Sequence, residues 1–223
     1  SLEVDEASLA KVMVHIKPHI IVFTNIFRDQ LDRYSELDAL LKIIKTSLET
    51  AQDTVMIINA DDPSLASLAE SLPHGKYYYG IETAIDMGSQ ELARDNVFCK
   101  QCGYRLDYEH YFYGQLGHYT CGKCNFKRTI PDFKAYIQDS VSKRELTVIG
   151  KDNFKVVRDF NVNDTYSIYN TLAAVSCTAL LGNTPETVLK GLENYRPQVG
   201  RMEGFFIGKP ITLNLAKNPV GFN

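Results

Sequence analysis

The stretch that decides the fold is residues 20–58, which read IIVFTNIFRDQLDRYSELDALLKIIKTSLETAQDTVMII. Its two ends, 20–26 and 54–58, are short apolar runs rich in β-branched residues, which is typical of buried strands. Between them, leucine and isoleucine recur at helical spacing over 37–48, and Ser35 with Asp38 forms a capping-box pattern. Strand, helix and strand in this order predict a right-handed βαβ unit and a parallel sheet.

The same alternation continues toward the C-terminus for one more unit. Asp62-Pro63 predicts a helix N-cap followed by proline in the first turn, with the helix running to about Leu72. Residues 76–79 are expected to form a third strand. The sequence therefore predicts an α/β fold with a mainly parallel sheet flanked by helices.

The rhythm changes near residue 95. Residues 125–160 have the pattern of short hairpin strands. Helical patterns return over 167–181 and from Pro185 to Tyr195, and the segment after residue 201 is strand-like at FFIGKPITLNL. These patterns predict short hairpin strands, then two helices, then a final strand-like segment.

Four of the five cysteines fall into two pairs of the form CxxC, Cys99 with Cys102 and Cys121 with Cys124. Eighteen residues separate the pairs, a spacing typical of a zinc ribbon whose four thiolates enclose one tetrahedral ion. Gly103 and Gly122 favour the tight turns that such a site needs. The alternatives to a zinc site are four ordinary buried thiols or two disulfides. Within a zinc site, His118 is the alternative ligand to one of the cysteines. Cys177 is expected to be a core residue.

Composition and charge narrow the class of protein. A net charge of −3 and a pI near 6.0 give no electrostatic footprint for nucleic acid. The chain holds no uninterrupted apolar run long enough to span a bilayer, and its first residues are too acidic for a signal peptide. Cysteines arranged for a metal indicate a reducing compartment, so we expect a cytoplasmic protein.

Six short motifs occur in a fixed order along the chain: EVDE at 3–6, TNI at 24–26 leading to DQLDRY at 29–34, NADDP at 59–63, YNTLAA at 169–174, GRME at 200–203 and LAKNP at 215–219. Together they resemble the central domain of the Mur ligase family, whose sheet is similar to that of P-loop NTPases. The resemblance divides the chain into a first part of the central domain at 1–95, a zinc-ribbon insertion at 96–130, a second part at 131–205, and the start of a C-terminal domain at 206–223.

The resemblance also implies a set of functional residues for ATP and Mg²⁺. A magnesium ligand is implied at Glu3, a phosphate-side position at Asn25, and an adenine-facing position at Asn170. The remaining implied residues serve the phosphate side (Asp29), the ribose or phosphates (Arg201), and both the interdomain hinge and the phosphate side (Lys217 and Asn218). Among these, Glu3, Asp29 and Lys217 are the implied catalytic residues, and Asn25, Asn170, Arg201 and Asn218 the implied nucleotide-binding ones.

Within the family, the spelling RDQLDRY, the four-cysteine insertion and the ending LAKNPVGFN are most similar to MurT-type ligases. This similarity implies ATP-dependent amidation of the D-glutamate of lipid II in peptidoglycan synthesis, with ammonia from a separate GatD-type glutaminase. The implied cofactors are ATP, Mg²⁺ and structural Zn²⁺. The family's G-x-x-x-x-G-K-[ST] loop is expected upstream of Glu3, and the C-terminal domain barely begins. We therefore expect a chain truncated at both ends and inactive alone.

One departure and two alternatives accompany this interpretation. Gln30 stands where many relatives carry a histidine, so a second Mg²⁺ is expected to be held differently. The first alternative is an ATP-dependent amide ligase of another substrate, similar to folylpolyglutamate synthases. The second is a binding module for a protein or nucleic acid, with a basic face on the ribbon at Lys100, Arg105, Lys123, Lys127 and Arg128.

Overall fold

A computed structural model describes residues 1–5, 8–26, 37–84, 97–139, 144–160, 165–195 and 203–213. Its centre is a six-stranded sheet of order β1-β2-β3-β6-β7-β8. The strands are β1 (Ile20–Phe23), β2 (Val55–Asn59), β3 (Lys76–Ile81), β6 (Phe133–Asp139), β7 (Arg144–Ile149) and β8 (Lys155–Phe160). Pairing is parallel from β1 to β6 and antiparallel from β6 to β8, which confirms the predicted mainly parallel sheet.

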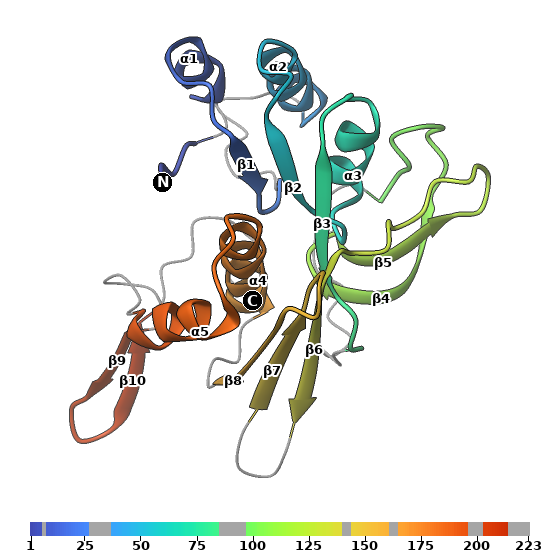
Figure 1. Cartoon of the computed structure of the whole chain (residues 1–223). Coiled ribbons are helices and arrows are strands. Elements are labelled where there is room, and N and C mark those ends of the chain that lie inside the picture. Colours follow the sequence, from blue (N-terminus) through green and yellow to red (C-terminus); the bar gives the residue numbers. More distant parts are fainter. Residues whose placement is uncertain are drawn as a thin grey trace.

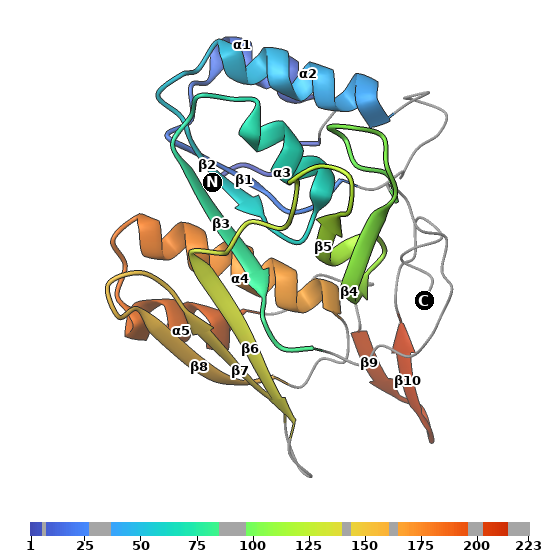
Figure 2. The ribbon, with the colours of Figure 1, turned by 90° about the vertical axis from the view of Figure 1, so that its right-hand side faces the viewer.

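Helices cover both faces of this sheet, so the domain has three layers (Figures 1 and 2). One face packs against α1 (Leu9–His15), α2 (Leu37–Glu49) and α3 (Pro63–Glu70), and the other against α4 (Thr165–Leu180) and α5 (Pro185–Asn194). Alternation along β2 supplies both cores, because Met56 and Ile58 join the first core and Ile57 joins the second.

The cysteine segment leaves the sheet after β3 and returns to it at β6. Its main element is a hairpin of β4 (Leu106–Tyr113) and β5 (Leu116–Cys121), which forms a separate two-stranded sheet. We call residues 97–128 the ribbon. It has a small core of its own around Leu106, Tyr119 and Phe126, which reaches Ala66 of α3. A last hairpin joins β9 (Glu203–Phe206) to β10 (Pro210–Leu213).

The structure confirms the predicted strands and four of the helices, with end points that differ by a few residues. The sequence did not predict α1. This helix has seven residues, and its N-cap residue, Ser8, makes no side-chain capping bond, so the usual start signal is missing. No helix in the described part of the chain is both long and apolar enough to cross a membrane.

Candidate functional site

Polar side chains gather where β1, β2 and β3 end. Asn59, the last residue of β2, donates from Nδ2 to the Thr24 carbonyl at 3.0 Å, and its Oδ1 accepts from the Asp61 amide at 3.0 Å. The Tyr79 hydroxyl donates to the Phe23 carbonyl at 2.9 Å. The ends of three neighbouring strands are therefore held to one another, and the carboxyl edge of a parallel sheet is where α/β proteins bind ligands.

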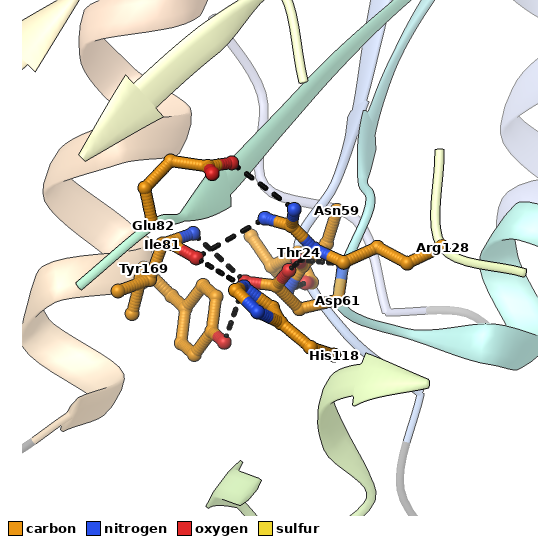
Figure 3. Close-up of polar contacts among 8 residues, drawn as sticks. All are labelled: Thr24, Asn59, Asp61, Ile81, Glu82, His118, Arg128 and Tyr169. Carbon is orange, nitrogen blue, oxygen red and sulfur yellow. Dashed lines mark hydrogen bonds and ion pairs between the residues drawn. The ribbon is translucent and has the colours of Figure 1, made fainter. Parts of the chain in front are cut away.

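The centre of this network is the fully buried carboxylate of Asp61 (Figure 3). Its Oδ2 accepts from the Ile81 amide and from the Tyr169 hydroxyl, both at 2.9 Å. Its Oδ1 accepts from Nε of Arg128 at 2.5 Å. Burial raises the pKa of Asp61 above its ordinary value, and the positive charge of Arg128 acts in the opposite direction.

Arg128 belongs to the ribbon, and its guanidinium reaches the ends of these strands, where it has three partners. Besides Asp61, it contacts the Glu82 carboxylate at 3.0 Å and the Ile81 carbonyl at 3.1 Å. Burial lowers the pKa of Arg128, but Asp61 and Glu82 outweigh it and hold the pKa above its ordinary value. Only 11% of this side chain is exposed, so Arg128 cannot serve the basic binding face that the sequence suggested as an alternative.

Gly80 makes room for this ion pair. A Cβ atom at Gly80 would lie 2.5 Å from Nη2 of Arg128 and 2.9 Å from Oδ1 of Asp61. We expect Gly80→Ala to lower the free energy of unfolding by about 1–3 kcal/mol, because the guanidinium must move off its partner. Urea unfolding measures this change. Gly75→Ala is the control, since its Cβ would meet Val55 at an ordinary 3.7 Å. Equal effects at both glycines would contradict the steric argument.

Asp62 is also fully buried, and both of its oxygens are used within the fold. Oδ1 accepts from the amides of Ser64 and Leu65 and caps α3, as the Asp-Pro pair predicted. Oδ2 accepts from the Ile26 amide at 3.0 Å. Gln115 of the ribbon completes the arrangement by donating to the Ile26 carbonyl at 2.8 Å. The loop after β1 is therefore held by α3 on one side and by the ribbon on the other.

The buried carboxyl of Asp62 predicts a pH effect. Burial raises its pKa from 3.8 to about 6, against the opposing amide bonds. Between these values the folded state binds a proton that the unfolded chain releases, so stability falls as pH rises from about 4 to about 6, by on the order of 2–3 kcal/mol. Asp62→Asn does not titrate. The stability of the parent minus that of this variant should fall over that pH range, as measured by urea unfolding.

The matched control is Asp53→Asn, which removes an exposed carboxyl. Its stability difference from the parent should show no comparable change between pH 4 and 6. A difference between the parent and Asp62→Asn that stays flat with pH would contradict the raised pKa.

The four predicted cysteine ligands come together at the tip of the ribbon, with all four sulfurs within 4.8 Å of one another. Sγ of Cys99 lies 3.7 Å from that of Cys124, and Sγ of Cys102 lies 3.5 Å from that of Cys121. All four thiols are free, so no disulfide joins them. A tetrahedral zinc ion with bonds of about 2.3 Å places its sulfurs about 3.8 Å apart, so the cluster fits such an ion closely.

Two similar turns build this cluster. In each one the amide of the first cysteine donates to the carbonyl five residues later, from Cys99 to Tyr104 at 2.7 Å and from Cys121 to Phe126 at 2.9 Å. Backbone amides within each turn also donate to the first sulfur of the pair. Burial holds the pKa of Cys99 above its ordinary value, whereas at Cys121 the amides and neighbouring thiols outweigh burial and lower the pKa to about 6. Gly103 has a φ of +72°, as a tight turn requires. Gly122 has no positive φ, but a Cβ there would lie only 3.2 Å from Oδ2 of Asp107, so this glycine serves close approach in its turn and not a left-handed backbone.

We call the carboxyl ends of β1, β2 and β3, together with the Asp61 network, the strand edge. The cysteine cluster and the strand edge are parts of one connected structure. Near the cluster, Lys100 contacts Asp38 of α2 at 2.7 Å, and Gln101 contacts Glu70 of α3 at 2.5 Å. At the other end of the ribbon, the Gly117 amide donates to the Asp61 carbonyl at 2.9 Å. The ribbon is therefore attached to the helices at its tip and to the strand ends at its base.

The structure describes only some of the residues to which the family resemblance gave a role. Glu3 is exposed in the N-terminal segment, Asn25 is half-buried two residues after the end of β1, and Asn170 is exposed on α4 beside Tyr169. Asn25 and Asn170 thus lie in the two segments that meet the Asp61 network. The other implied residues, Asp29, Arg201, Lys217 and Asn218, lie outside the described residues, as does Gln30.

His118 is not a ligand of the cysteine cluster. Its Nε2 lies 2.8 Å from the Ile81 carbonyl, at the strand edge. The sequence did not predict Tyr169 and Gln115 as parts of the site, and Arg128 was expected on an exposed face in the binding-module alternative. Each of these contacts joins residues far apart in the chain, for which the sequence carries no local signal.

Comparison with known proteins places this architecture in a family. The Mur ligase middle domain family matches residues 2–121. The chain is 34% identical to the lipid II isoglutaminyl synthase (glutamine-hydrolyzing) subunit MurT of Staphylococcus aureus, over 100% of this chain and 49% of the relative. The Streptococcus pneumoniae subunit of the same name is also 34% identical, over 99% of this chain and 48% of the relative. The chain thus spans about half the length of these two curated relatives.

A solved structure shows the same fold. The pseudomurein peptide ligase type C of Methanothermus fervidus superposes with a TM-score of 0.77 at 29% identity, covering 92% of this chain and 40% of that one. The matched family domain spans more than half of the chain and includes β1, β2, β3, Asp61 and three of the four cysteines. Arg128, Tyr169 and Cys124 lie beyond the matched residues. The chain belongs to the Mur ligase family, and residues 2–121 match the middle domain of that family.

Proposed function

We propose that this chain supplies the middle domain of an ATP-dependent ligase subunit that converts the D-glutamate of lipid II to D-isoglutamine. The observation that carries the proposal is 34% identity, along the whole chain, to lipid II isoglutaminyl synthase subunits of two bacterial genera. The relatives' name includes glutamine hydrolysis, so a GatD-type glutaminase is the proposed partner. The free thiols of the ribbon agree with a reaction in the cytoplasm, at the membrane surface where lipid II is held.

The proposed reaction is an activated amide synthesis. ATP transfers its γ-phosphoryl group to the α-carboxylate of D-glutamate, and ammonia from the glutaminase then displaces phosphate to leave the amide. Such phosphoryl transfer depends on Mg²⁺ and on positioned donors more than on covalent catalysis. The proposed magnesium ligand is Glu3, and the proposed nucleotide contacts are Asn25 and Asn170. Outside the described residues, the proposed contributors remain Asp29, Arg201, Lys217 and Asn218.

The strand edge limits which carboxylates are free for Mg²⁺. Three donors occupy Asp61 and three amides occupy Asp62, and both side chains are fully buried. We therefore assign both residues a structural role, in which they fix the ends of β1, β2 and β3. Glu3 is exposed, and no hydrogen bond or ion pair within the described part of the chain occupies its carboxylate, which supports its proposed role as a metal ligand.

For the cysteine cluster we propose one structural Zn²⁺. Four thiolates fill all four positions of a tetrahedral ion, so no position is open for a water or a substrate. The ion's proposed role is to hold the tip of the ribbon together, so that the base of the ribbon can present Arg128 and Gln115 to the strand edge.

The test is ATP-dependent amidation of lipid II by the full-length ligase subunit with its glutaminase, glutamine and Mg²⁺. Mass spectrometry should show that one carboxylate of the stem peptide has become an amide. Glu3→Gln should reduce the rate at least tenfold, whereas the exposed-site control Asp53→Asn should not change it. Amidated product that still forms at the parent rate with Glu3→Gln would remove Glu3 from the site and leave the reaction standing.

A peptide ligase is the second candidate, because a solved pseudomurein peptide ligase is 29% identical over 92% of this chain. That reaction joins an amino acid instead of ammonia to an activated carboxylate. The same assay separates the two candidates. ATP consumed only when an amino acid is supplied, with no amidated lipid II, would favour the peptide ligase and overturn the proposed amidation.

A further inference from the structure

A second group of metal-ligand side chains lies on the hairpin of the ribbon, separate from the four cysteines. Glu109, His110 and His118 offer one carboxylate oxygen and two imidazole nitrogens, and these ligand atoms all lie within 4.8 Å of one another. We propose that these three side chains form a binding site for a divalent transition metal, with Zn²⁺ as the ion that best fits two imidazoles and a carboxylate.

A β-bulge brings the three side chains to one face. Tyr108 pairs with Tyr119 and His110 pairs with His118, so the two steps from 108 to 110 on β4 lie opposite a single step on β5. In a regular strand, neighbours such as Glu109 and His110 point to opposite faces. The extra residue of a bulge removes this alternation, so both can point to the face that carries His118.

Ring contacts on the two faces agree with this shift. Tyr108 and Tyr111 stack with ring centroids 4.1 Å apart, although residues three apart in a regular strand lie on opposite faces. On the other face, the rings of His110 and His118 meet edge to face at 5.4 Å. Gly117 permits the bulged strand to come close, since a Cβ there would lie 2.1 Å from the His110 carbonyl oxygen.

The His118 ring is held as metal-binding histidines usually are. Its Nε2 lies 2.8 Å from the Ile81 carbonyl oxygen, which can only accept, so Nε2 carries the proton and Nδ1 keeps its lone pair. Histidine ligands of metals commonly donate their second nitrogen to a backbone carbonyl in this way, which fixes both tautomer and ring orientation. His118 is therefore the preorganised ligand of the proposed site.

The other two ligands are free to close on the ion. Nε2 of His110 lies 3.7 Å from the Glu109 carboxylate, and the exposed fractions of these side chains are 34% and 79%. Ligand atoms of a tetrahedral zinc with bonds of about 2.0–2.1 Å lie about 3.4 Å apart, so a rotation of the partly exposed His110 and the exposed Glu109 completes the geometry. Three protein ligands leave the fourth position for water, unlike the closed cysteine cluster.

The site adjoins the strand edge through one carbonyl group. The Ile81 oxygen that fixes His118 also accepts from Nη2 of Arg128 at 3.1 Å. A metal bound to His118 would therefore strengthen the attachment of the hairpin to β3, next to the Asp61 ion pair. We expect the bound metal to protect the Ile81–Arg128 region from local opening.

The test titrates Zn²⁺ into the full-length protein after its cysteine cluster has been loaded with one equivalent. Calorimetry should detect one additional ion per chain. The variants His110→Ala and Glu109→Gln change a partly exposed and an exposed side chain, and each should weaken this binding at least tenfold. The control His19→Ala removes an exposed histidine elsewhere and should leave the dissociation constant unchanged. Hydrogen exchange at Ile81 should slow when the second ion binds.

Two outcomes would overturn the proposal. One is saturation at a single equivalent of Zn²⁺ per chain. The other is a second equivalent whose affinity is the same in His110→Ala and in the parent, which would place that ion elsewhere. The readouts are metal binding and hydrogen exchange without lipid II or ATP, so neither outcome depends on the proposed ligase function.

Discussion

Replacing Cys102 and Cys121 together with serine is expected to abolish zinc binding at the cysteine cluster and to release the ribbon from the sheet. Their sulfurs lie 3.5 Å apart and form one edge of the proposed tetrahedron, so the variant keeps only two thiolates. Binding of a structural zinc ion supplies on the order of 10 kcal/mol, which acts as folding free energy for the segment that encloses it. Elemental analysis should show a loss of one zinc equivalent per chain.

The release should be visible in hydrogen exchange across residues 97–128, and it should extend to the strand edge that Arg128 and Gln115 contact. Cys177→Ser is the matched control, because this half-buried thiol lies on α4 and belongs to no group of potential metal ligands in the described part of the chain. It should retain the full zinc content. A double serine variant that keeps its zinc, or a parent protein that never binds it, would refute the structural-zinc assignment.

The sequence predicted those parts of the structure whose cause is local. The double CxxC spacing predicted the cysteine cluster, because two residues three apart in a tight turn reach one ion without help from the rest of the fold. Asp62-Pro63 predicted the start of α3, because a cap needs only the next two or three amides. The apolar run at 54–58 predicted β2, because a short stretch of β-branched and apolar residues is itself the signal of a buried strand.

The contacts that define the strand edge could not be predicted in this way. Arg128 and Asp61 are 67 residues apart, and Tyr169 and Asp61 are 108 apart. Nothing near Arg128 in the chain distinguishes a buried ion-pair partner from the exposed basic residues around it. Gly80 carried a signal, since a glycine inside a strand often marks a close approach by another group, but that signal does not name the group.

The ion pair between Arg128 and Asp61 is the second feature with a large expected effect. Arg128→Met should lower the free energy of unfolding by about 3–5 kcal/mol, because it leaves a fully buried carboxylate without its counter-ion. Adding Asp61→Asn in the same chain should restore part of this loss, since the uncompensated charge is then gone. A double-mutant cycle in urea gives the coupling energy between the two side chains.

The loss of stability caused by Arg128→Met should also depend on pH, and the pKa of Asp61 determines the direction of this dependence. Burial already holds the pKa of Asp61 above its ordinary value, and removing Arg128 removes a charge that lowers it. A carboxyl whose pKa is higher in the folded than in the unfolded state loses stability as pH rises between the two values, so the deficit should be largest at neutral pH and should shrink on acidification. The control is Arg144→Met, which breaks the exposed pair with Asp139 and should change stability little. A deficit that is independent of pH, or that persists in full when Asp61 is asparagine, would mean that Arg128 acts through its packing and not through its charge.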